Sequence, residues 1–215
     1  MKTDHLDAEK RALLAAALRE VPFSGWSDRI LVHAAKAAGL DPTLPLRAFP
    51  GGVAELVDFF VAEADRAMVA ALAARDLAGL RIPERIALAI RLRLEGQAGH
   101  KEAVRRAAAF YALPFHAARA LKGLYRTVDA MWHAAGDTAT DFSFYTKRMT
   151  LAGVYSATLA YWLQDRSEGS AATWAFLDRR LRDVGRIPRL RRRLDDLAGG
   201  ILRPERAFAR RPRRR

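Results

Sequence analysis

Apolar residues recur along this chain at spacings of three and four, the repeat that places side chains on one face of an α-helix. The longest stripe lies between Val53 and Ala74 and consists of Leu56, Val57, Phe60, Val61, Ala64, Met68 and Leu72. Ala, Leu and Arg dominate the sequence, and runs of β-branched residues of strand length are missing. Because these residue types favour helices over strands, the pattern predicts an all-α protein.

Proline, glycine and capping residues divide the chain into about ten helical segments. Pro22 is expected to stop the first segment, and Ser27 and Ser170 are expected to cap two later ones. The expected helices cover residues 7–19, 27–39, a short piece from 41, 53–74, 82–95, 99–112, 114–135, a helix capped by Asp137 or Thr138 that ends near 164, 171–184, and a last one after Pro188.

The order of elements in the first third resembles the helix-turn-helix head of tetracycline-repressor-like regulators, whose third helix enters the major groove of DNA. Here that helix would lie in residues 41–49, which hold two prolines, one acid and one base. Pro45 would remove a backbone donor within it. Residues 21–52 carry three bases and two acids, a net of +1, whereas duplex binding rests on several phosphate contacts. The head is therefore expected to be vestigial, with no specific DNA partner.

Positive charge is concentrated at the end of the chain. The 37 Lys and Arg against 24 Asp and Glu give a net of +13. Residues 179–215 hold 15 Arg and 4 acids, a net of +11, which leaves +2 for residues 1–178. A polyanionic partner would therefore meet the C-terminal part. The longest uncharged stretch, Met149–Gln164, has 16 residues, fewer than the roughly 20 that a spanning helix needs.

A basic amphipathic helix is expected at residues 186–203, followed by a disordered Arg-rich tail at 204–215. Such a helix would lie on an anionic membrane surface. The residues expected to bind the membrane are Ile187, Leu190, Leu194 and Leu197 with Arg186, Arg189 and Arg193. A solvated tail and binding to nucleic acid remain the alternatives.

Aromatic residues gather in the rear half, where 13 of the 19 lie between Phe110 and Phe176. Two neighbouring helices carry apolar faces that would either pack tightly together or leave a chamber for an apolar ligand. Gly153, which has no side chain, would leave room for such a ligand. The residues expected to line this chamber are Leu124, Tyr125, Val128, Met131, Trp132, Leu151, Val154, Tyr155 and Leu159.

Catalytic patterns are poorly represented. The chain has no Cys, no Glu followed three residues later by His, and no phosphate-binding Gly-rich loop. His133 lies four residues after Asp129, one helical turn away. This pair keeps an enzyme open as a rival hypothesis. The prediction is a protein without catalytic residues, metal or cofactor.

Several motifs in the rear half identify a family resemblance. They are Leu124–Asp137, Thr140-Asp141-Phe142-Ser143-Phe144-Tyr145-Thr146-Lys147-Arg148, Tyr161–Ser167 and Thr173–Leu177, joined by Phe23–Trp26 and Phe49–Gly52 in the head. Together they resemble the ubiquinone (coenzyme Q) biosynthesis accessory family over about residues 10–185. That resemblance implies a tetracycline-repressor-like fold.

The resemblance also implies a function. The family consists of non-catalytic, membrane-associated proteins that bind isoprenylated quinone precursors and present them to a di-iron hydroxylase. By motif match, the surface that would contact this hydroxylase consists of Asp141, Phe142, Phe144, Tyr145, Lys147 and Arg148. Ser143 and Phe144 depart from the Asn and Trp that are common in the family. The alternative is a tetracycline-repressor-like transcription regulator that senses an apolar effector.

These interpretations divide the chain into a helix-turn-helix-like head at 1–52, a lipid-binding bundle at 53–185, and the C-terminal helix and tail. The N-terminal residues are polar and lack the pattern of a signal or transit peptide. The expected location is therefore the cytoplasm, peripheral to a bacterial inner membrane. Whether the protein forms a homodimer stays open at this point.

Overall fold

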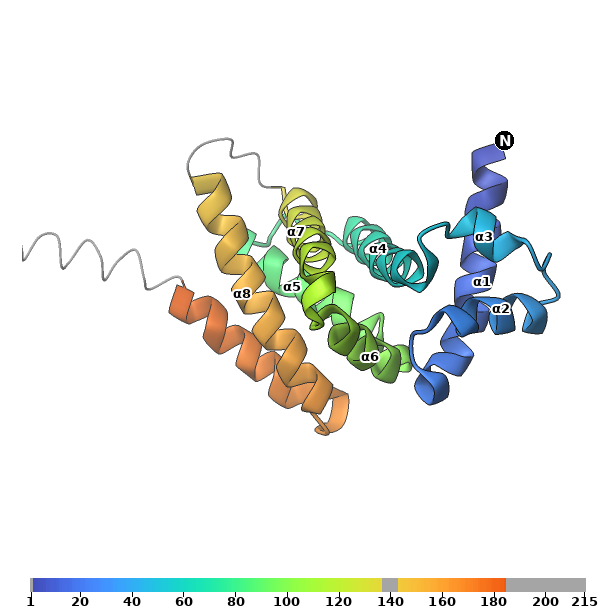
Figure 1. Ribbon diagram of the computed structural model, residues 1–215. Helices are drawn as coiled ribbons and strands as arrows, with labels where there is room; N and C mark the ends of the chain where they lie inside the picture. Colours follow the sequence, from blue (N-terminus) through green and yellow to red (C-terminus); the bar gives the residue numbers. More distant parts are fainter. Residues whose placement is uncertain (1, 137–142, 185–215) are drawn as a thin grey trace, which may run out of the picture.

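The computed structural model describes residues 2–136 and 143–184, which form helices joined by short loops, without a strand among them (Figure 1). The α-helices are α1 (Lys2–Ser24), α2 (Asp28–Ala37), α3 (Leu44–Ala48), α4 (Gly52–Ala73), α5 (Ile82–Glu95), α6 (Lys101–Tyr111), α7 (Ala117–Ala134) and α8 (Ser143–Gln164). Residues 171–184 form a further helix. Short 3-10 helices are η1 (Ala98–His100), η2 (Pro114–His116) and η3 (Glu168–Ser170). The predicted all-α fold is confirmed.

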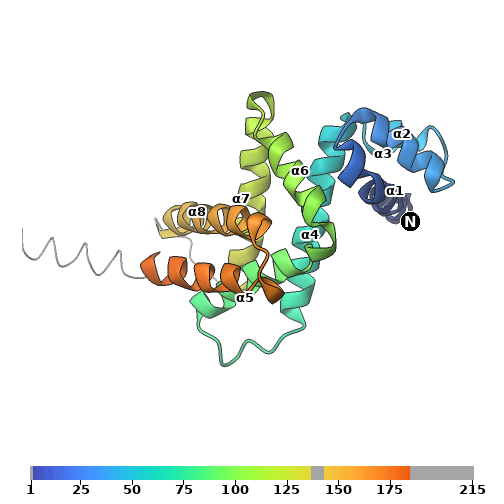
Figure 2. The same cartoon turned by 90° about the horizontal axis from the view of Figure 1, so that it is seen from below.

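The head consists of α1, α2 and α3, and α1 also contacts α6 (Figure 2). The head's core continues into the first half of α4 and into α6. Its buried residues are Leu13, Leu14, Ala16, Ala17, Val21, Ile30, Leu31, Ala34, Ala35, Leu44, Ala48, Phe49, Leu56, Val57, Phe60, Ala103 and Ala107. Residues on both sides of position 52 thus share one core, and the predicted domain boundary there stays a prediction.

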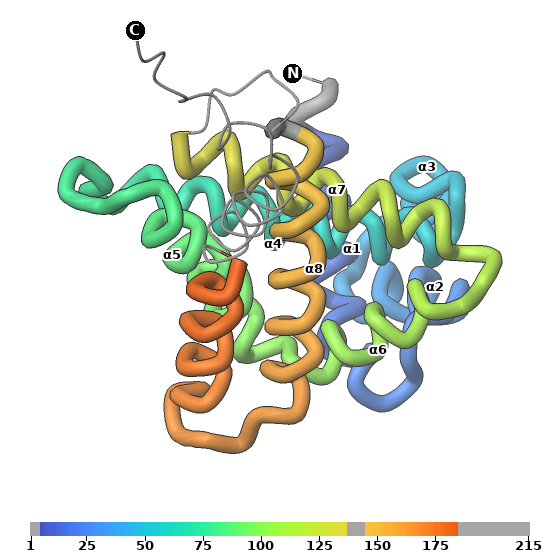
Figure 3. The backbone as a smooth tube through the Cα atoms, turned by 90° about the vertical axis from the view of Figure 1, so that its left-hand side faces the viewer, coloured from blue at the N-terminus to red at the C-terminus, as the bar shows by residue number. Residues whose placement is uncertain are grey.

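The rear bundle is built around α4, which packs against α5 and α7, while α7 packs against α8. The helix at 171–184 lies beside α8, to which a short turn connects it (Figures 1 and 3). The second core consists of Met68, Leu72, Ile86, Ala89, Ile90, Leu94, Val128, Met131, Ala135, Leu151, Val154, Tyr155, Trp162, Leu163 and Leu177. Because α4 contributes to both cores, it ties the head to the bundle.

The first helix runs past the expected stop. α1 ends at Ser24 and contains Pro22, so the prediction that Pro22 ends it was wrong. Near a helix end, a proline removes only one backbone hydrogen bond, and the remaining turn can still form. The Pro22 carbonyl oxygen accepts a hydrogen bond from Arg106 Nη2 at 2.8 Å. This contact fixes the end of α1 against α6.

The predicted cap at Ser170 was also wrong. Ser170 has a φ of 57°, in the left-handed region. The capping side chains lie further upstream: Ser167 Oγ accepts from the Ala172 N–H at 3.0 Å, and Asp165 Oδ2 accepts from the Thr173 N–H at 2.9 Å. These acceptors satisfy donors that a helix start leaves unpaired. Ser27, by contrast, does stand at the N-cap position of α2, although its side chain makes no capping hydrogen bond there.

The C-terminal predictions lie outside the described residues. They are the membrane helix at 186–203 and the tail at 204–215, and the expected caps Asp137 and Thr138 fall in the internal gap. Among the helices that the structure describes, none combines the length and apolar character that a bilayer crossing requires.

Candidate functional site

Two cavities with mostly apolar walls lie between the helices of the rear bundle. The first has a volume of about 320 Å³ and lies between α5, α7, α8 and the helix at 171–184. Its walls are mostly apolar, and they consist of Pro83, Ile86, Trp132, Thr146, Lys147, Thr150, Leu151, Val154, Leu181 and Val184. Four separate segments of the chain contribute to it. This convergence makes it a candidate site for an apolar ligand.

One residue in the wall of the first cavity, Trp132, carries an unpaired hydrogen-bond donor. Trp132 Nε1 is buried and has no acceptor within the part of the chain that the structure describes. Lys147 Nζ lies over the Trp132 ring, 5.6 Å from its centroid. A buried donor without a partner costs about 1–3 kcal/mol. A ligand oxygen in the cavity would remove that cost only after the indole turns its N–H toward the cavity.

The second cavity has a volume of about 200 Å³ and lies between α4, α5, α6, α7 and α8. Its walls combine apolar residues with several polar ones. They consist of Phe60, Val61, Arg93, Val104, Ala107, Ala108, Tyr111, Ala120, Gly123, Leu124, Thr127, Tyr155, Ser156 and Leu159. Burial raises the pKa of Tyr155 above its ordinary value, so its hydroxyl stays protonated at neutral pH.

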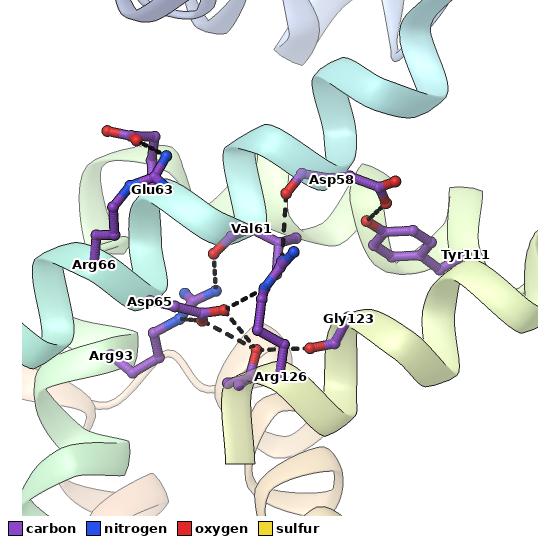
Figure 4. Close-up of polar contacts among 10 residues, drawn as sticks. Asp58, Val61, Glu63, Asp65, Arg66, Arg93, Tyr111, Gly123 and Arg126 are labelled. Carbon is purple, nitrogen blue, oxygen red and sulfur yellow. Dashed lines mark hydrogen bonds and ion pairs between the residues drawn. The ribbon is translucent and has the colours of Figure 1, made fainter. Parts of the chain in front are cut away.

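A buried polar cluster borders the second cavity and joins α4, α5 and α7 (Figure 4). Asp65 accepts hydrogen bonds from Arg93 Nε at 2.9 Å and from Arg126 Nε at 3.3 Å. The Thr127 hydroxyl lies 3.0 Å from both Asp65 oxygens and donates to that carboxylate. Arg93 Nη2 also donates to the Val61 carbonyl at 3.3 Å. The cluster therefore holds Arg93 in a fixed position at the cavity wall.

The residues predicted to line one chamber are distributed between the two cavities. Trp132, Leu151 and Val154 line the first cavity. Leu124, Tyr155 and Leu159 line the second. Val128 and Met131 are buried in the core, and Tyr125 is 44% exposed; none of these three lines either cavity. The sequence analysis missed Arg93 and Thr127, which no local motif marks as cavity residues.

The residues predicted to contact a partner lie in different environments. Tyr145 is 69% exposed on α8, and Lys147 lines the first cavity. Arg148 is buried, and its Nε and Nη2 atoms both lie 2.7 Å from Asp129 Oδ1. Asp141, Phe142 and the Phe144 side chain lie outside the described part. Met149 is 68% exposed, one turn from Tyr145 on the same helix.

The pair His133 and Asp129 kept the enzyme hypothesis open. The Asp129 carboxylate, however, lies closer to Arg148 than to His133. His133 Nδ1 lies 3.7 Å from Asp129 Oδ1, the oxygen that also receives the two Arg148 contacts. His133 is exposed on the surface of α7. Within residues 2–136 and 143–184, no group of three His, Cys, Asp or Glu side chains is arranged to hold a metal ion.

The third helix of the head offers little surface to DNA. α3 has five residues, and Leu44, Pro45 and Ala48 are buried. Leu46 and Arg47 face outward, and Arg47 Nη2 lies 3.7 Å from Asp41 Oδ2. A recognition helix needs several side chains that reach base edges or phosphates. The absence of a specific DNA partner stays a prediction that this geometry supports.

Comparisons with known proteins point to one family. The COQ9 family model matches residues 117–188. The chain is 34% identical over 184 residues to the Drosophila melanogaster protein "Ubiquinone biosynthesis protein COQ9, mitochondrial", which covers 84% of this chain and 56% of the relative. The human protein of the same name is 32% identical over 179 residues, covering 80% of this chain and 56% of its own length. This chain thus spans little more than half the length of these relatives.

A solved structure shares the fold. It is the crystal structure of the TetR transcriptional regulator from Nitrosomonas europaea ATCC 19718, with a TM-score of 0.66 over 81% of this chain and 96% of that one. The sequence identity is 22%, so the likeness extends to the fold alone. The predicted tetracycline-repressor-like architecture is confirmed.

Proposed function

Because this chain belongs to the COQ9 family, we propose that it is a non-catalytic accessory protein of ubiquinone biosynthesis that binds an isoprenylated quinone precursor. The curated relatives carry ubiquinone biosynthesis in their names. Since the chain spans about 56% of their length, its role, ligand and partners are proposals. The observation that carries the proposal is the apolar first cavity with its unpaired Trp132 donor.

The first cavity is where the precursor would bind. Its volume of about 320 Å³ is at the lower end of ligand pockets. It would hold the ring and the first part of the prenyl chain, while the rest of the chain stays in lipid. Each Å² of apolar surface removed from water contributes about 25 cal/mol. A turn of the Trp132 indole would bring its N–H to an oxygen on the ring, and this hydrogen bond would orient the ring within the apolar walls.

Presentation to the di-iron hydroxylase would take place at the outer face of α8. Tyr145 and Met149 are exposed four residues apart, so they share one face of the helix. Thr146 and Thr150, each one position further along, line the first cavity. A partner that docks on Tyr145 and Met149 would therefore lie next to the bound ring. Exposed aromatic and methionine side chains are typical of protein interfaces.

Membrane association is proposed for the segment at 186–203, at the cytoplasmic face of a bacterial inner membrane. Its apolar residues at spacings of three and four and its arginines are the features that support this proposal. Each basic residue near an anionic leaflet contributes about 1 kcal/mol. The helix would hold the first cavity close to the bilayer that supplies the precursor. A second copy of the chain, as a homodimer, is a further proposed partner.

The test is a reconstituted hydroxylation assay in anionic liposomes that contain the prenylated precursor. We expect this protein to raise the turnover of the di-iron hydroxylase. Val154→Phe narrows the first cavity and should abolish that stimulation. Leu159→Phe, which narrows the second cavity instead, is the matched control and should retain it. Stimulation by Val154→Phe equal to that of the wild type would contradict the assignment of the first cavity.

A further inference from the structure

A run of apolar residues is exposed where α6 turns into α7. Ala112, Leu113, Pro114 and Phe115 follow one another there, and all are exposed. The Leu113 and Phe115 residues are exposed by 43% and 76%. Figures 2 and 3 show this turn at an outer edge of the described structure. An exposed run of about four apolar residues is a defect unless it has a function, so the turn is a candidate contact surface.

Stacked rings hold this turn in place. The His116 ring stacks on the Phe110 ring, with centroids 3.9 Å apart and 20° between the planes. Phe110 in turn packs against the core of the head. The Phe115 ring lies edge-on to His116, with 4.4 Å between the centroids. Because these contacts fix the exposed ring before any partner binds, less conformational entropy is lost on binding.

The start of α7 extends the apolar surface. Ala118, Leu121, Lys122 and Tyr125 follow at spacings of three and four, which place them on one face of the helix. All of them are exposed, Leu121 by 64% and Tyr125 by 44%. We refer to residues 112–115 together with this face as the α6–α7 edge. The edge thus combines aromatic and aliphatic side chains with one lysine.

The charge of the α6–α7 edge is positive. Residues 112–128 contain Arg119, Lys122 and Arg126 but neither Asp nor Glu. The two arginines pair with carboxylates of α4, whereas Lys122 has no carboxylate partner among the residues that the structure describes. A lysine beside exposed apolar side chains suits an anionic lipid surface, because the apolar groups enter the interface and the ammonium reaches the headgroups.

The exposed apolar residues of the head lack this combination. Phe23 and Leu46 are 86% and 77% exposed. Glu20 lies one turn before Phe23 on α1, and an anionic membrane would repel it. The cation next to Leu46 is Arg47, which already lies 3.7 Å from the Asp41 carboxylate. Exposure alone therefore does not single out the α6–α7 edge, and the two head residues provide matched controls.

We propose that the α6–α7 edge is a second membrane contact, which inserts Phe115 and Leu121 into the headgroup region of an anionic bilayer while Lys122 contacts lipid phosphates. It is separate from the contact proposed for residues 186–203, and it does not rest on the ligand proposed for the first cavity. A single contact leaves a peripheral protein free to rotate on the membrane. A second one restricts that rotation and determines which side of the bundle faces the bilayer.

The experiment places one fluorescent label at a time on the full-length chain, which has no cysteine of its own. Leu121→Cys carries an environment-sensitive fluorophore and is mixed with vesicles of phosphatidylcholine and phosphatidylglycerol. We expect its emission to shift to the blue and to be quenched by nitroxide-labelled lipids. Leu46→Cys, at an exposed leucine of the head, carries the control label and should show neither change.

Unlabelled variants test the apolar and the charged parts of the edge separately. Phe115→Ser with Leu121→Ser should weaken binding to the anionic vesicles by at least about ten-fold, because two large apolar side chains no longer leave water. Phe23→Ser with Leu46→Ser is the matched pair and should bind like the wild type. Lys122→Gln should weaken binding by about five-fold and should leave binding to pure phosphatidylcholine vesicles unchanged.

The outcomes distinguish this contact from the C-terminal one. In a chain with Leu190→Ser and Leu194→Ser, the blue shift at position 121 should persist at higher lipid concentration. Loss of the shift at every lipid concentration in that background would overturn the separate contact. Vesicles that bind the protein without any shift at 121 would overturn the proposal and leave the contact at 186–203 in place. A shift that appears with the purified hydroxylase and not with vesicles would also overturn it.

Discussion

At the scale of single residues, Asp65 determines the stability of the buried polar cluster. Its carboxylate is the shared acceptor for Arg93, Arg126 and Thr127. Asp65→Asn leaves the Arg93 guanidinium buried without a counter-charge. Removing one partner of a buried ion pair costs about 3–5 kcal/mol, and we expect the free energy of unfolding in urea to fall by that amount.

Asp58 provides the control for this substitution. It lies on the same helix, is partly exposed, and accepts from Tyr111 and Arg119. Asp58→Asn keeps the shape of the side chain, and exposed ion pairs contribute at most about 1 kcal/mol. If Asp65→Asn proved as mild as Asp58→Asn, the buried cluster would not have the energetic role described here.

Gly52 allows the turn between α3 and α4 to form. It has a φ of 66°, and a Cβ at this position would lie 2.6 Å from Asp28 Oδ1. That oxygen accepts from the Val53 N–H at 2.8 Å, so a side chain at 52 would displace the cap of α4. We expect Gly52→Ala to lower the thermal midpoint, with a cost of about 1–3 kcal/mol for the strained backbone.

Gly79→Ala is the comparison for Gly52→Ala. No atom lies within 4 Å of a Cβ built at Gly79, and its φ lies outside the left-handed region. The substitution should leave the thermal midpoint almost unchanged. An equal effect of the two substitutions would contradict the role assigned to Gly52.

At the scale of elements, Asp165 links the end of α8 to the helix at 171–184. Hydrogen bonds from the hydroxyls of Thr173 and Ser167 and from backbone N–H groups lower the pKa of its carboxyl below the ordinary value. A lowered pKa in the folded state means that the ionised form stabilises the fold. This contribution is present above the unfolded pKa of about 3.9 and is lost as the pH falls below it.

The corresponding measurement is urea unfolding of the wild type and of Asp165→Asn between pH 7 and pH 3. The wild type should lose more stability over this range than the variant, because the variant has no charge to titrate at this position. Parallel pH profiles would show that the Asp165 cap does not stabilise the folded state.

The outer face of α8 is the proposed contact for the hydroxylase. Tyr145→Ala with Met149→Ala removes two exposed side chains and should weaken the complex by at least ten-fold, as expected for two anchoring residues at an interface. Surface plasmon resonance would measure the affinity. Tyr125→Ala, an exposed residue on α7, should leave it unchanged. An unaltered affinity of the double variant would exclude this face as the docking surface.

Helix positions could be predicted wherever local signals decide them. The helix predicted at 82–95 corresponds to α5 (Ile82–Glu95), which Pro83 opens and Gly96 follows. The cap at Ser170 could not be predicted, because the conformation of the preceding turn places Asp165 and Ser167 at the N–H groups. Helical periodicity likewise marked an apolar face on α7, but it could not reveal which turns of that face border a void.

Contacts between distant positions were beyond the reach of the sequence pattern. Asp65 and Arg93 are separated by 28 positions and Asp65 and Thr127 by 62, and no spacing rule relates such pairs. The unpaired Trp132 N–H depends on the packing of several helices. The sequence therefore predicted an aromatic chamber, whereas the structure divides it into two cavities with different polar groups.

At the scale of the whole molecule, the head and the bundle share α4, whose first half contributes to one core and whose second half contributes to the other. Trp26 Nε1 of the head donates to the Ala103 carbonyl of α6 at 3.2 Å. These contacts give the head a structural role in holding α4 and α6. The head of a regulator fold is thus compatible with a protein whose ligand-binding region lies in the bundle.

The central claim is that the first cavity holds an isoprenylated aromatic ring, and native mass spectrometry of the purified chain tests it most directly. We expect the wild type to carry a bound molecule whose released mass corresponds to a prenylated quinone precursor. Val154→Phe, folded by thermal melt, should lose that mass, and Leu159→Phe should retain it. A wild-type protein that carries no such molecule after purification from membranes rich in the precursor would contradict the account.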